Sequence, residues 1–186
     1  MGIPTLIKTL TASGDSSLSF VDGTSDVTLD STYDEYMFVF TDINPATDGA
    51  EFSFQVNATD DAGGGYDTSQ IQSTLFDSFQ QESGASSGVA YYAAYDQANG
   101  TAFQPLNFNL GNGSDESLAG ILHLFNPAST TYVKHFYART SYTHQTEEAD
   151  QSFIAGYIND TTAIDEIQFK MDSGNFDGVI QLFGIS

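Results

Sequence analysis

Alternation of apolar and polar residues with a period of two is the feature that most restricts the fold of this chain. In the segment 163–185, Ile167, Phe169 and Met171 alternate with polar neighbours, which places one apolar face along a strand. A turn with Gly and Asn follows at 172–175, and a second apolar stretch returns from it. The pattern predicts a β-hairpin over 163–185.

The return stretch of this predicted hairpin is apolar on both faces. Ile180 and Leu182 share one face, while Val179, Phe183 and Ile185 share the other. A sandwich core can take only one face of a strand, so the second face needs another layer. We therefore take Val179, Phe183 and Ile185 as candidate interface residues, to be covered by a neighbouring subunit. The alternation does not decide which face enters the core, so the alternative is that the two faces are exchanged.

Short stretches with the same alternation recur along the chain and are separated by Gly- and Asn-rich turns. Segments 36–40 and 52–56 form the clearest predicted hairpin, and 68–79, which also fits one helical face, is interpreted as a strand. Further strands are predicted at 5–11, 89–95, 102–110, 118–125, 132–140 and 153–158. An Asn-Pro-Ala echo at 44–46 and 126–128 suggests two related halves. We predict an all-β protein: one domain, 1–186, folded as an antiparallel, jelly-roll-like β-sandwich.

The charge balance excludes several partners. The chain has 25 acidic residues and only Lys8, Lys134, Arg139 and Lys170 as basic ones, a net charge of -21. Nucleic acid and anionic membranes need clustered basic residues, so neither is expected as a partner. The chain has no cysteine, which excludes disulfides and thiolate metal sites. We find no signal-peptide pattern and no apolar run of membrane-spanning length.

Candidate catalytic and metal-binding residues are few. Ser86 lies in a G-x-S-x-G match at 84–88, but a polar stretch precedes it where a nucleophile elbow needs a buried strand. A small-residue loop is the preferred interpretation. Of the three histidines, His123 and His135 fall on neighbouring predicted strands and could face each other as metal ligands, whereas His144 lies apart. Hydrogen-bonded strand histidines are the preferred interpretation.

Two further groups bear on binding. Asp60, Asp61 and Asp67 flank a glycine-rich stretch and are candidate calcium ligands, with a solvated acidic loop as the alternative. No cofactor is predicted. Tyrosine supplies rigid amphipathic area for sugar or protein contacts or for a core, and it recurs at Tyr91, Tyr92, Tyr95, Tyr132, Tyr137 and Tyr142.

Several segments resemble a group of virion structural proteins from marine tailed phages. They are 19–25 (SFVDGTS), 96–104 (DQANGTAFQ), 122–136 (LHLFNPASTTYVKHF) and the ending 182–185 (LFGI), and the resemblance extends over essentially the whole chain. These motifs are turns and strands without a catalytic residue. The resemblance therefore implies a non-enzymatic protein of the virion, made in the host cytoplasm, and carries over no functional residue.

Within this class we expect a capsid decoration (cement) protein, because the chain has no shaft to project a fibre tip. The expected partners are further copies of the chain, as a homotrimer, and other virion proteins such as the major capsid protein. A tail or fibre receptor-binding module that contacts a host surface glycan is the first alternative. A carbohydrate-binding module is the second.

The acidity generates a prediction about salt. At low ionic strength, self-repulsion among the acidic side chains should lower the melting temperature, and salt or a divalent cation should raise it. Thermal unfolding followed by circular dichroism from low to marine salt measures this shift. A melting temperature that does not change with salt would contradict it.

Overall fold

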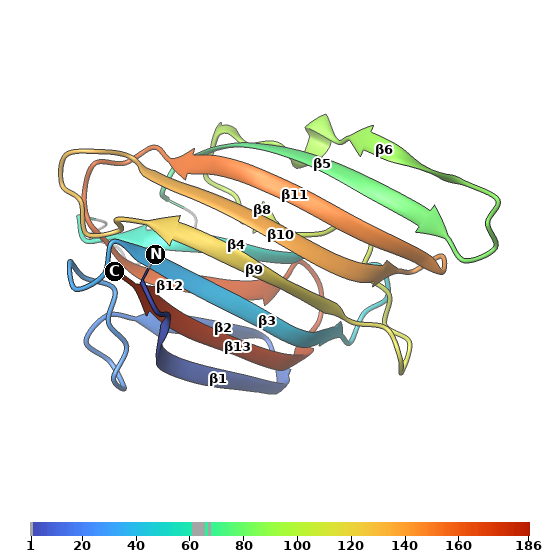
Figure 1. Cartoon of the computed structure of the whole chain (residues 1–186), viewed down its shortest axis with the longest axis horizontal. Helices are drawn as coiled ribbons and strands as arrows, with labels where there is room; N and C mark the ends of the chain where they lie inside the picture. Colours follow the sequence, from blue (N-terminus) through green and yellow to red (C-terminus); the bar gives the residue numbers. More distant parts are fainter. Residues whose placement is uncertain (1, 61–65, 67) are drawn as a thin grey trace.

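Two antiparallel β-sheets face each other in the computed structural model, which describes residues 2–60, 66 and 68–186 (Figure 1). The smaller sheet has the order β2 (Ser17–Val21), β12 (Ile164–Met171), β4 (Phe52–Ala58) and β8 (Gln104–Pro105). The larger has the order β1 (Thr5–Asp15), β13 (Phe176–Ile185), β3 (Glu35–Pro45), β9 (Leu118–Phe125), β10 (Lys134–His144), β11 (Glu148–Ile158), β5 (Ile71–Gln81) and β6 (Ser87–Tyr91). The short β7 (Ala98–Gly100) also pairs with β5, and one 3-10 helix, η1, spans Ala93–Tyr95.

The strand order is that of a jelly roll. The four strands β1, β13, β3 and β9 lie opposite β2, β12, β4 and β8. Consecutive members of this set cross from one sheet to the other, except β4 and β8, which pair with each other in the smaller sheet. In a jelly roll, two Greek keys are interleaved in this way. The predicted all-β antiparallel sandwich is therefore confirmed.

Two insertions extend the larger sheet beyond β9. One insertion, between β4 and β8, supplies β5, β6 and β7, and the other, between β9 and β12, supplies β10 and β11. Although distant in sequence, they pair through β11 and β5 in one continuous register from Glu148↔Gln81 to Ile158↔Ile71. The larger sheet therefore projects past the smaller one, toward the top of Figure 1.

The two predicted hairpins, 163–185 and 36–40 with 52–56, are wrong, because the two strands of each do not pair with one another. β12 and β13 adjoin in sequence but lie in different sheets, with β12 between β2 and β4 and β13 between β1 and β3. The same holds for β3 and β4. The 172–175 turn, with Gly174 at φ 74°, joins the two layers and does not reverse a strand within one layer. The predicted division of each strand into two faces nevertheless holds, because alternation groups the side chains by face whichever strand is the neighbour.

Aromatic rings fill the space between the sheets. The Phe169 ring of β12 lies within 6.4 Å, centroid to centroid, of five other phenylalanine rings. They come from both sheets and are Phe20, Phe38, Phe40, Phe52 and Phe54. Ile180 and Leu182 of β13 are fully buried in the same core.

Two predicted strands are mostly irregular. Of 89–95, the first part belongs to β6 and the rest forms η1, while 102–110 contributes only the two residues of β8 and an isolated bridge at Leu110. Side-chain amides replace part of the missing ladder, as the Asn107 Oδ1 accepts the Phe52 N–H at 2.7 Å. This stretch covers the inner face of the added strands, where Tyr92, Tyr95 and Phe108 pack together.

The burial of Leu182 predicts a large loss of stability on truncation. Leu182→Ala should lower the free energy of unfolding by about 2 to 5 kcal/mol, since it removes apolar contacts and leaves a cavity between the sheets. Urea denaturation measures this loss. Gln181→Ala, one residue away on the half-buried outer face, is the control and should change stability by less than about 1 kcal/mol.

Candidate functional site

The outer face of the larger sheet, the side turned away from the smaller sheet, is apolar over most of its width. Cross-strand register aligns outward-facing side chains in two rows that run across the strands. One row is Phe183, Met37, His123 and Tyr137, and the other is Gln181, Val39, Ile121, Arg139, Phe153, Phe76 and Tyr91. We call these two rows, with Val179 beside them, the outer patch.

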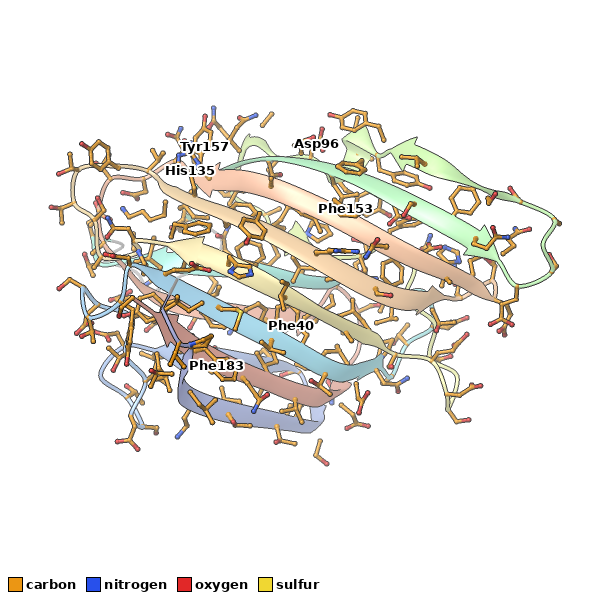
Figure 2. All side chains as sticks on the ribbon, viewed as in Figure 1. Phe40, Asp96, His135, Phe153, Tyr157 and Phe183 are labelled. Atoms are coloured by element: carbon orange, nitrogen blue, oxygen red, sulfur yellow. The ribbon has the colours of Figure 1, made fainter. Side chains whose placement is uncertain are left out.

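Large side chains of this patch are exposed to solvent. Phe76 and Tyr137 each keep 43% of their surface exposed and Tyr91 keeps 63%. A hollow of about 480 Å³ lies over β9, β10, β11 and β5, with Phe76, Ile121, Tyr137 and Phe153 in its lining. Figure 2 shows Phe153 and Phe183 on this sheet. Exposed apolar area of this extent, in continuous rows, is typical of an interaction surface.

The aromatic rings of the patch are packed face to face with their neighbours. Phe76 and Phe153 stack at 4.8 Å between centroids, and the Arg139 guanidinium lies 5.2 Å from the Phe153 centroid on the opposite flank. Tyr137 stacks on His123 at 4.5 Å, and the His123 Nδ1 contacts the Glu35 carboxylate. The ring faces that could stack on a sugar are therefore largely occupied.

Acidic residues are absent from most of the patch. In β9, β10, β11, β5 and β6, no outward-facing side chain is acidic, because Asp77, Glu148 and Asp150 lie on the inner face in the alternation. Arg139 is the charged residue at the centre. Glu35 lies at one margin and Asp177 at another. For a chain of net charge -21, this distribution separates an acidic surface from a nearly neutral one.

The three interface candidates named from sequence belong to this face. Val179, Phe183 and Ile185 are half-buried and lie opposite the buried Ile180 and Leu182. The predicted division of β13 into two faces is therefore confirmed, and the structure shows that Ile180 and Leu182 are on the core side, which the sequence left open. The role of Val179, Phe183 and Ile185 in an interface stays a prediction.

The metal candidates are not brought together. Asp60 is exposed and accepts a hydrogen bond from the Thr162 hydroxyl at 2.9 Å, while Asp61 and Asp67 lie outside the described residues. His135 packs against Tyr157 at 5.8 Å and His123 against Tyr137, so the two rings have different partners. His144 lies on the inner face against Phe108. Across residues 2–60, 66 and 68–186, no three His, Asp or Glu side chains are arranged to hold a metal ion.

Ser86 lies in the exposed turn between β5 and β6, two antiparallel strands. A nucleophile elbow requires a strand followed by a helix, so this turn lacks the required setting.

No helix in the described part of the chain is long and apolar enough to cross a bilayer.

Two buried carboxylates form a feature that the sequence does not reveal. Asp77 of β5 and Asp150 of β11 are at most 2% exposed, and Asp77 lies opposite Ser152 in the ladder. The Ser152 hydroxyl donates to Asp77 Oδ1 at 3.0 Å, and the Tyr142 hydroxyl lies 3.1 Å from Ser152 Oγ. Both oxygens of Asp150 and one of Asp77 have no hydrogen-bond partner.

This environment favours the protonated carboxyl groups. Burial, with the nearby Asp77 and Glu148 charges, raises the pKa of Asp150 to about 7. Burial also raises the pKa of Asp77 to about 6, against the opposing hydrogen bond from Ser152. Burial raises the pKa of Tyr142 and lowers that of His144, so these neighbours stay neutral at pH 7. Asp150, which receives no hydrogen bond, is the carboxyl that keeps its proton longest.

Comparison of the sequence with models of protein families finds no match, and comparison with curated proteins finds no match either. The class of the protein is therefore described from the structure alone. It is a jelly-roll sandwich with an extended sheet and an apolar, nearly acid-free outer face.

The carboxylate pair predicts that the protein loses stability as pH rises. Both folded pKa values lie above the unfolded value of 3.8, so the folded state binds more protons between about pH 4 and pH 7. The free energy of unfolding should therefore fall over this range. Asp150→Asn should flatten its pH dependence by up to about 1.4 kcal/mol per pH unit.

Urea denaturation at several pH values measures this slope. Asp115→Asn, at an exposed acidic residue, is the control for loss of one negative charge and should keep the wild-type slope. Equal slopes in the wild type and Asp150→Asn would contradict the buried-proton account.

Proposed function

We propose that the protein is a non-enzymatic structural component of a virion, and specifically a capsid decoration protein on the particle surface. The observation that carries this proposal is the outer patch. It is a broad apolar face without a catalytic or metal-binding constellation among the described residues that line it, on a chain that is otherwise strongly acidic. Such a face suits lasting contact with protein and not turnover of a substrate.

The charge distribution supports a role at the exterior of a particle. Away from the patch, the acidic side chains give each subunit a strong negative field. A layer of such subunits makes neighbouring particles repel one another, which opposes aggregation. The nearly acid-free face allows close approach without this repulsion.

The fold supports the same proposal by analogy. Jelly rolls occur in viral capsid proteins, but also in lectins and cupins, so the fold alone does not assign a function. The resemblance of segments 19–25, 96–104 and 122–136 to virion proteins of marine tailed phages supports a phage particle as the location of the protein.

A glycan-binding role, either in a tail or fibre receptor-binding module or in a carbohydrate-binding module, is the second candidate. The exposed Tyr91 and Tyr132 favour it, with 63% and 71% of their surfaces accessible. It ranks lower because the stacked pairs Phe76–Phe153 and His123–Tyr137 use their ring faces internally. A sugar needs a free ring face on which to pack.

Labelling of purified particles tests the proposal. Gold-labelled antibody against the chain should mark many sites over the head in electron micrographs, and mass spectrometry should find the protein in the same particles. Label confined to the tail would overturn the decoration role in favour of receptor binding. Absence from the particles would overturn the virion assignment altogether.

A further inference from the structure

We infer that a second copy of this chain covers the outer patch, with the two larger sheets packed face to face, a two-fold pair in place of the homotrimer expected from the sequence. The inference rests on the proposed function, in which the patch mediates assembly, and adds the identity of the partner. Three features of the patch support self-association: its area, its charge and its shape.

The area of the patch is that of a small protein interface. It spans seven strands from β13 to β6, and with about 4.8 Å between strands and two rows that occupy about four residues of each strand, its area is on the order of 450 Å² per copy. Two copies together would bury on the order of 900 Å², the size of a weak, reversible protein contact. A contact through β13 alone would be several times smaller.

The charge of the patch suits a second copy better than a strongly charged partner. The patch has one central guanidinium, from Arg139, and two carboxylates at its margins, from Asp177 and from Glu35, which contacts His123. A basic partner would find too few acidic groups there, and an acidic partner too few basic ones. Two nearly neutral patches meet without this mismatch, although the chain as a whole carries a net charge of -21.

The shape of the patch allows a closed pair. A two-fold axis through one sheet face brings the same residues of both copies together, and facing sheets pack at about 10 Å with interdigitating side chains. The hollow of about 480 Å³ over β9, β10, β11 and β5 is large enough to receive an aromatic side chain from the facing copy. Because the same face is used on both copies, the pair does not grow into a fibre.

A charge placed in the patch tests the inference in solution, without particles. Wild-type protein at micromolar concentration and marine salt should sediment with at least twice the 20.0 kDa mass of one chain. Phe153→Glu, at the centre of the patch, should sediment as a monomer with an unchanged circular dichroism spectrum. Tyr132→Glu, an equally drastic change at an exposed aromatic residue outside the patch, is the control and should keep the wild-type mass.

Cysteine cross-linking provides a second readout that does not depend on how Phe153→Glu folds. The chain has no cysteine, so Ala155→Cys, which lies beside Tyr137 of the patch, and Ala85→Cys in the β5–β6 turn each introduce a single thiol at an exposed position. A short bis-maleimide reagent should link two copies through position 155 and not through position 85.

A monomeric wild type, or an oligomer that persists in Phe153→Glu, would overturn the self-association. Neither result bears on whether the protein occurs in particles, which the antibody labelling decides. A wild-type monomer together with head labelling would assign the patch to a different virion protein, and the proposed function would stand without the dimer.

Discussion

The contact of phenylalanine rings between the two sheets is the interaction on which the rest of the structure depends. Phe169 lies at its centre and touches rings from β2, β3 and β4, so it joins strands of both layers. A buried aromatic side chain contributes more apolar area than any aliphatic one, and edge-to-face pairs add to this gain. This packing fixes which face of each central strand points inward. The opposite faces, the outer patch included, follow from it.

Alternation in the sequence predicted burial well and pairing poorly. Ile167, Phe169 and Met171 are buried as their spacing indicated, and Ile180 and Leu182 face the core while Phe183 does not. The period of two identifies the buried side of a strand but contains no information about the neighbouring strand. Connections such as 172–175 therefore looked like hairpin turns, although they lead from one layer to the other. The Asn-Pro-Ala echo misled for the same reason, since 44–46 leads between sheets and 126–128 between paired strands.

The candidate site was predictable only in part. The two apolar faces of β13 revealed one end of the outer patch, because Val179 and Phe183 had no core to enter. The other end joins Phe76 to Phe153, which are far apart in sequence and come from separate insertions. The Asp77 and Asp150 pair depends on the same register between β11 and β5. The sequence shows each as a single acidic residue within a strand and does not predict that the two are neighbours. Long-range pairing is the information that local pattern lacks.

The position of β13 within the larger sheet determines when the fold can be completed during synthesis. β13 separates β1 from β3, and β12 separates β2 from β4, so each sheet has a gap until residues 164–185 have left the ribosome. Contacts between β1 and β13 span most of the chain, and such long-range contacts form late. A nascent chain therefore cannot close the sandwich or present the whole apolar face before residues 164–185 have emerged. The strand order thus makes the outer patch complete only at the end of folding.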